Sequence, residues 1–157
     1  MAILTVHVQP EPFDMAAEAA HLKKLPGIGA IVTFSGLCRD EGGRLAALEL
    51  EHYPGMAEAE IGRIAEEAAT RWPLVGITVI HRTGTIAVGD DIVLVATASS
   101  HRDAAFAAAN FVMDYLKTRA PFWKKEHPAG AASGDWVVAH DDDNETAARW
   151  QRHGPKT

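Results

Sequence analysis

Lysines and aromatic residues gather in one short segment, and their spacing points to amine chemistry. Lys117 lies in the last turn of a predicted helix, and Lys124 and Lys125 directly follow Phe122 and Trp123. A lysine beside apolar groups or other cations releases its proton more easily, and it can then act as a nucleophile or a general base. If the same lysines stay charged, they can stabilise an anionic intermediate. A cation in the last turn also stabilises a helix without any function, so Lys117 alone does not separate these readings.

Two further basic residues lie at the start of the same predicted helix. His101 and Arg102 fall in its first turn, where the helix dipole is positive and cations are disfavoured. Free backbone N–H groups together with two basic side chains suit an anion such as a phosphate or a carboxylate. Arg39 is a third candidate, because it follows an apolar strand pattern and precedes a Gly-rich turn. A solvated charge in a turn explains Arg39 equally well.

The helix that carries these groups is expected from residue 101 to residue 119. Apolar residues recur on one face, at Ala105, Ala109, Val112 and Leu116. We expect Ser100 to be the N-cap, in a capping box with Asp103, and Pro121 to end the helix. The 15 residues from Arg102 to Lys117 span about 22 Å. One copy therefore cannot hold a small ligand with both ends, and we hypothesise one site shared between the two subunits of a homodimer.

Composition excludes several classes of protein. The 157 residues are expected to form one domain, 1–157, with a short tail from about residue 151. No apolar run is long enough for a membrane span, and no signal peptide is apparent. With only Cys38 no internal disulfide can form, which favours the cytoplasm. The net charge of −6 argues against nucleic-acid binding.

The charge is also unevenly distributed. Residues 101–126 hold five Lys or Arg and three acidic residues, a net +2, whereas the rest holds ten against eighteen, a net −8. A basic focus on an acidic protein suits a small anionic ligand. The histidines lack metal-ligand spacing, so no metal site is expected. The residues Asp141–Asp143 are better explained as the cap of a terminal helix.

Periodicity predicts an α+β fold with a mostly antiparallel sheet and helices packed on it. Residues 28–36 and 45–53 are expected to pair as a hairpin, with Leu48, Leu50 and His52 on one face. Residues 83–90 are expected to be a connection. The acidic face of helix 57–71 is expected to be solvated. The expected strands are 3–8, 28–36, 45–53, 75–82, 91–98 and 136–139, and the expected helices are 15–25, 57–71, 101–119 and a terminal one ending near 150.

Six stretches of the chain carry a family resemblance. The longest is residues 113–126, Met-Asp-Tyr-Leu-Lys-Thr-Arg-Ala-Pro-Phe-Trp-Lys-Lys-Glu. The others are residues 32–36 with Arg39, 50–56, 71–74, 79–84 and 100–102. On these stretches the chain, from about residue 10 to 150, resembles the large, catalytic subunit of molybdopterin synthase.

The resemblance implies an α/β-hammerhead-type fold and a sulfurtransferase of molybdenum cofactor biosynthesis. Such an enzyme transfers sulfur to cyclic pyranopterin monophosphate and forms the dithiolene of molybdopterin. The sulfur arrives as a thiocarboxylate on the C-terminal Gly-Gly of a small ubiquitin-like subunit. The implied assembly is a heterotetramer around a homodimer of large subunits, with no cofactor of its own, no nucleic acid and no membrane. Phosphate and thiocarboxylate are both anionic, which agrees with the local positive charge.

By position, the resemblance assigns two catalytic lysines and several substrate contacts. Lys117 would act at the thiocarboxylate carbonyl, as acid/base or transient acyl acceptor, and Lys124 would stabilise negative charge there. The implied substrate-binding residues are Leu37, Cys38, Arg39, His101, Arg102, Lys117, Lys124, Lys125 and Glu126.

Some positions depart from the family pattern. Leu37 stands where a cation is frequent, and Cys38 stands where an aliphatic residue is usual, so Cys38 is expected to be a packed apolar residue. Loop 127–134 is expected to be mobile, and His140 stands where another basic residue can occur. Two other functions keep the basic groove: an adaptor that binds a ubiquitin-like Gly-Gly tail, and a phosphate sensor built on His101 and Arg102. The spacing of Lys117 and Lys124 favours the enzyme.

Overall fold

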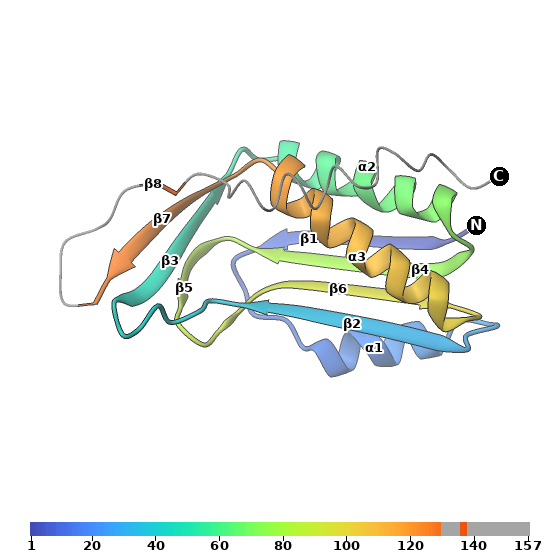
Figure 1. Cartoon of the computed structure of the whole chain (residues 1–157). Coiled ribbons are helices and arrows are strands. Elements are labelled where there is room, and N and C mark those ends of the chain that lie inside the picture. Colours follow the sequence, from blue (N-terminus) through green and yellow to red (C-terminus); the bar gives the residue numbers. More distant parts are fainter. Residues whose placement is uncertain (130–135, 138–157) are drawn as a thin grey trace.

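Two four-stranded sheets form the framework of the chain, and Figure 1 shows the sheet that contains Leu45–His52 and Phe122–Pro128 at one end of the sheet that contains Leu74–Arg82 and Asp91–Ser99. The structure is a computed structural model that describes residues 1–129 and 136–137. The strands are β1 (Ile3–Gln9), β2 (Ala30–Leu37), β3 (Leu45–His52), β4 (Leu74–Arg82), β5 (Gly84–Ala87), β6 (Asp91–Ser99), β7 (Phe122–Pro128) and β8 (Trp136–Val137). The helices are α1 (Met15–Lys23), α2 (Met56–Arg71) and α3 (Arg102–Arg119).

The strand pairing confirms the expected α+β plan. The first sheet has the order β1-β4-β6-β2, and the second has the order β5-β3-β7-β8. The pair β1–β4 is parallel, and the other pairs among the described strands are antiparallel. The antiparallel neighbours β4 and β6 are joined by the short segment that contains β5, as is usual for antiparallel pairs.

The predicted hairpin of residues 28–36 and 45–53 is wrong, because β2 and β3 belong to different sheets. Strand β2 pairs with β6 along its whole length, from Ala30 opposite Ser99 to Leu37 opposite Asp91. Strand β3 is apolar on one face and carries Glu49 and Glu51 on the other. A strand with this alternation fits a sheet that has one solvent-exposed face. Strand β6 is buried on both faces and belongs to the first sheet, where it pairs with β2.

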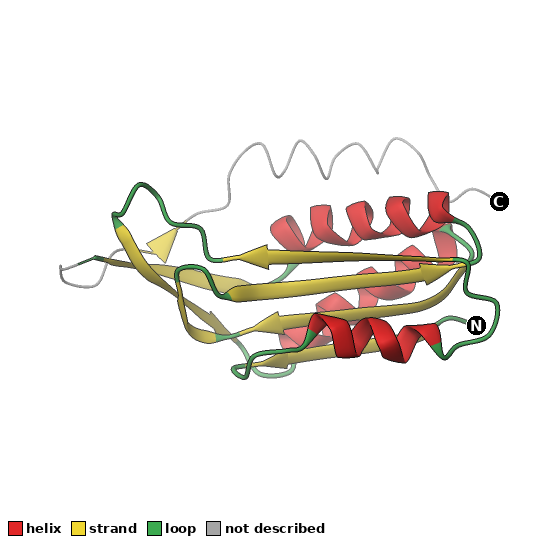
Figure 2. Cartoon of the chain, turned by 90° about the horizontal axis from the view of Figure 1, so that it is seen from below, coloured by secondary structure: helices red, strands yellow, loops and turns green. Residues whose placement is uncertain are grey.

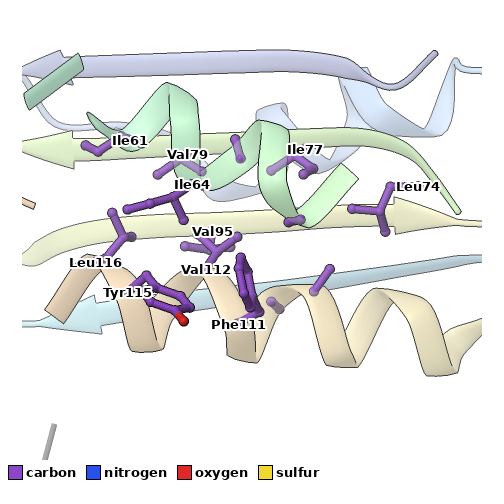
Figure 3. Packing of buried hydrophobic residues seen from close by; sticks show 14 of the residues in the cluster. Ile61, Ile64, Leu74, Ile77, Val79, Val95, Phe111, Val112, Tyr115 and Leu116 are labelled. Atoms are coloured by element: carbon purple, nitrogen blue, oxygen red, sulfur yellow. The ribbon is translucent and has the colours of Figure 1, made fainter. Parts of the chain in front are cut away.

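Helices cover both faces of the first sheet. Helices α2 and α3 lie on one face and α1 lies on the other, as the two views show. The main core lies under α2 and α3, where Ile61, Ile64, Phe111 and Val112 pack on Val95 and neighbouring side chains of β4 and β6 (Figure 3). Burial of these side chains removes apolar surface from water, which holds α3 against the sheet.

The limits of α3 depart from the prediction at one end only. Ala120 has an extended backbone before Pro121, so the helix ends at Arg119 as predicted. The N-cap is His101, however, and the capping box of Ser100 and Asp103 is wrong. The Ser100 hydroxyl donates instead to the carbonyl of Gly27, at 3.1 Å. A β-carbon on Gly29 would lie 2.1 Å from the Ser100 carbonyl oxygen, so this close approach of two loops requires glycine and holds Ser100 outside the helix.

Strands β5 and β7 were not predicted. Strand β5 lies inside the expected connection 83–90, and His127 and Pro128 of the expected loop 127–134 belong to β7. Strand β7 is rich in charged residues and lacks an apolar alternation, so it becomes a strand through its pairing with β3. Strand β8 covers part of the predicted strand 136–139. Residues 130–134, His140, the aspartates 141–143 and the predicted terminal helix lie outside the described residues.

Candidate functional site

A pocket of about 560 Å³ opens where the C-terminal end of α3 meets the second sheet. Its wall combines apolar side chains with three cations and two carboxylates. The cations are Arg39, Lys117 and Lys124, and the carboxylates are Glu41 and Glu126. The other lining residues are Phe34, Gly36, Leu37, Leu45, Leu48, His81, Ile92, Val93, Met113, Leu116, Thr118, Ala120 and Phe122. An apolar cavity with a few converging charges is the usual form of a small-molecule site.

Lys117 and Lys124 reach this pocket from two different elements. Lys117 lies in the last turn of α3, where the helix dipole favours a cation. Lys124 lies on β7 directly opposite Leu50 of β3, and Glu126 lies opposite Leu48. Because side chains alternate along a strand, Lys124 and Glu126 share a face, and Lys125 lies on the opposite face. Lys125 accordingly does not line the pocket within the single chain.

The segment after β2 brings Arg39 to the pocket and buries its neighbour. Cys38 is 1 % exposed, its N–H donates to the carbonyl of Asp90, and its carbonyl accepts from Gly89. Burial raises the pKa of the Cys38 thiol, which agrees with the expected packed residue. Leu37 and Arg39 on either side line the pocket. The Arg39 guanidinium is mostly exposed and lies 3.8 Å from a Glu41 carboxylate oxygen.

His101 and Arg102 do not join this pocket. Both side chains are exposed at the opposite end of α3. The helix separates Arg102 from Lys117 by 15 residues, or about 22 Å. The predicted site residues of one chain therefore form two separate groups, one at each end of the helix.

Arg119, a basic residue of segment 101–126, does not line the pocket, because it pairs with carboxylates of α2. Its guanidinium forms salt bridges with Glu60 at 2.8 Å and Glu67 at 3.3 Å. These glutamates belong to α2, so the prediction that this acidic helix face is only solvated is wrong. The pairing ties α2 to α3 and leaves Lys117, Lys124 and Arg39 as the cations that line the pocket.

His81 is a pocket residue that sequence reasoning did not select. It lies one residue before Arg82, the last residue of β4, in the buried part of that strand, and is 8 % exposed. Its ring stacks on Phe122, with centroids 3.9 Å apart and planes inclined by 14°. Burial, together with the nearby Lys124, His52 and Lys117, lowers the pKa of His81 to about 4. The available signal was the polar pair His81–Arg82 at the end of an otherwise apolar strand.

The opposite faces of Lys124 and Lys125 lead to a direct comparison. We expect Lys124→Ala to reduce the activity at this pocket at least about ten-fold more than Lys125→Ala, because a cation that faces a reacting anion contributes far more than one outside the site. Steady-state rates of the two purified variants, compared at one salt concentration, measure the difference. Equal losses would contradict the single-chain geometry and support the substrate contact that the family resemblance implies for Lys125.

Two further observations concern the part of the chain that the structure describes. No group of three or more His, Cys, Asp and Glu side chains there could hold a metal ion. None of the helices in that part is both long and apolar enough to cross a membrane.

Known proteins resemble this chain over nearly its whole length. The family profile described as MoaE protein matches residues 8–119. A molybdopterin synthase catalytic subunit of Mesorhizobium japonicum is 64% identical over 148 residues, which cover 94% of this chain and 93% of the relative. The solved structure of molybdopterin cofactor biosynthesis protein E from Burkholderia multivorans superposes with a TM-score of 0.81 at 48% identity, covering 95% of this chain and 97% of that one.

A more distant structure shares the fold. It is the protein–protein complex of subunits 1 and 2 of the molybdopterin-converting factor from Helicobacter pylori. The matching chain superposes with a TM-score of 0.66 at 19% identity and covers 89% of this chain and 92% of its own length.

Proposed function

The chain belongs to the MoaE protein family, whose relatives are molybdopterin synthase catalytic subunits, and we propose that its sulfur-transfer chemistry takes place in the pocket between α3 and β7. It is a sulfurtransferase of molybdenum cofactor biosynthesis. One observation supports the location above the others: two lysines from separate elements, Lys117 and Lys124, line the same apolar pocket together with Arg39.

The proposed substrates are both anionic. Cyclic pyranopterin monophosphate accepts sulfur, and a thiocarboxylate donates it, so that the product carries a dithiolene. Lys117 acts at the thiocarboxylate carbonyl, either as acid/base or as transient acyl acceptor. Lys124 stabilises the negative charge that develops there. Arg39, which is exposed at the mouth, attracts the phosphate, and the proposal needs neither a resident cofactor nor a metal.

The proposed sulfur donor is a small ubiquitin-like partner with a C-terminal Gly-Gly. The Helicobacter pylori relative in fold was solved as a complex of two subunits, which supports a partner of this kind. A tail of two glycines is slender enough to enter a pocket of about 560 Å³ alongside a pterin. We place this heteromeric enzyme in the cytoplasm, where a chain with a single, buried cysteine needs no oxidising compartment.

We further propose that two copies of the chain form the core of a heterotetramer. In that homodimer, His101 and Arg102 of one copy complete the pocket that Lys117 and Lys124 of the other copy line. The length of α3 supports this arrangement, since one copy keeps the two groups about 22 Å apart. A two-fold axis brings opposite ends of equivalent helices together without any further element.

Reconstitution tests the function. The purified chain is mixed with a thiocarboxylated small subunit and cyclic pyranopterin monophosphate, and the product is oxidised to its fluorescent form. Product formation that requires all three components is the expected result. A chain that binds the small subunit tightly but forms no product would contradict the enzyme and favour a Gly-Gly adaptor.

Mixing two inactive variants tests the shared site. If Lys117 and Arg102 act from different copies, then mixed dimers of Lys117→Ala and Arg102→Ala contain one intact site. Random exchange makes about half of the dimers mixed, so about a quarter of the wild-type activity is expected to return. If both groups acted from the same copy, each site would retain one defect and no activity would return. Light scattering on the mixture confirms the dimer.

A further inference from the structure

We propose that Nε2 of His81 accepts a hydrogen bond from an N–H group of the bound pterin and so orients its ring in the pocket. This inference rests on the proposed function, since it assigns a new contact for the same substrate. His81 lies outside the set of residues that the resemblance assigns to substrate binding. It is a lining residue of the pocket, beside Lys117 and Lys124.

The hydrogen bond at the other ring nitrogen decides which atom can accept. Nδ1 of His81 lies 2.9 Å from the carbonyl oxygen of Arg82. A carbonyl oxygen only accepts, so Nδ1 must carry the hydrogen, and in a neutral ring Nε2 then bears the lone pair. Among the described residues the structure records no hydrogen-bond partner for Nε2. His81 is therefore a lining residue with a ring acceptor that has no protein partner in the described part of the chain, in a pocket whose other side-chain nitrogens belong to the cationic donors Arg39, Lys117 and Lys124.

The ring is also held in place before any ligand binds. It stacks on Phe122, which is two residues before Lys124 on β7. Phe122 in turn lies 6.0 Å from the His52 ring of β3. A buried ring that is held by stacking and by one backbone hydrogen bond loses little further conformational entropy when it binds a ligand. The position of Nε2 is thus fixed relative to Lys124 before a ligand binds.

The charge of the ring favours the same role. With its pKa lowered to about 4, His81 is neutral at physiological pH. The groups that act on it come from three elements: Lys124 on β7, His52 on β3 and Lys117 on α3. A protonated ring would lose its lone pair and would add a further positive charge beside the two lysines. The neutral ring instead complements the N–H edge of a pterin, while the cations complement its phosphate.

Three substitutions separate this contact from a structural role. His81→Gln places a polar atom near the position of Nε2, and His81→Asn keeps only the position of Nδ1. His81→Phe keeps a ring to stack on Phe122 but has no acceptor. In the reconstituted enzyme we expect His81→Asn and His81→Phe to raise the KM for the pterin about ten-fold, as for the loss of one hydrogen bond. We expect His81→Gln to stay within about three-fold of wild type, and the KM for the thiocarboxylated subunit to stay unchanged in all three.

Each outcome decides the question. A wild-type KM for the pterin in His81→Asn and His81→Phe, or an equal rise in all three variants, would overturn the contact and leave the proposed function intact. A wild-type enzyme that forms no product would overturn the proposed function itself. If His81→Asn does not fold, which circular dichroism reports, the comparison of His81→Phe with His81→Gln gives the answer, since only the glutamine keeps an acceptor.

Discussion

Replacing Lys117 with alanine is expected to reduce sulfur transfer by at least about a thousand-fold, while binding of the small partner stays near wild type. The expected loss is that of a group that acts directly at the reacting carbonyl, as acid/base or as acyl acceptor. Lys117 is exposed in the last turn of α3, so its removal leaves no buried cavity and costs the fold little. The reconstitution assay measures the rate, and calorimetry with the thiocarboxylated subunit measures the binding.

Lys23→Ala provides the matched control. Lys23 is also an exposed lysine in a last turn, but its helix, α1, lies on the opposite face of the first sheet (Figure 2). The net charge of the two variants is the same, so any general electrostatic effect on the anionic substrates is shared. Full activity of Lys117→Ala, or an equal loss in Lys23→Ala, would refute the catalytic role.

Acidification from pH 7 to pH 4 is expected to remove about 3 kcal/mol of stability through His81 alone. The folded chain holds this ring with a pKa of about 4, whereas the unfolded chain has the ordinary value of 6.5. Between these values the unfolded chain binds one more proton, so acid favours unfolding. The contribution is fully present above pH 6.5, decreases as the pH falls, and levels off below pH 4.

The variant His81→Gln isolates this contribution from that of other titrating groups. Urea unfolding of wild type and variant at several pH values gives two curves of unfolding free energy. From pH 7 to pH 4 the stability of the wild type relative to the variant is expected to fall by about 3 kcal/mol, because only the wild type carries the buried imidazole. Parallel curves would show that the folded chain does not keep His81 neutral.

Local signals in the sequence were sufficient for the helix that carries the site. The apolar face of α3 and Pro121 after it predicted where the helix ends, and the family motif placed Lys117 at that end. The separation of Arg102 from Lys117 also followed from the sequence, because the rise of a helix per residue is constant. Cys38 was correctly expected to be packed, since an isolated thiol beside a strand is usually buried.

Pairing between distant segments could not be predicted in this way. Strand β7 has no alternating apolar pattern, and it forms because β3 provides hydrogen bonds to it across the second sheet. That pairing alone turns Lys124 toward the pocket and Lys125 away from it. The partners of β2 and β3, the salt bridges of Arg119 and the stacking of His81 on Phe122 depend equally on contacts between remote residues.

The amino-acid sequence by itself thus determined the family, the reaction class and the residue types that carry it, because those depend on local motifs and on spacing along one helix. The tertiary structure decided which of those residues share one pocket and added His81 to them. The physical reason is that three properties depend on elements that meet only in the folded chain: which face of a strand a side chain occupies, how far a ring is buried, and which charges form a pair.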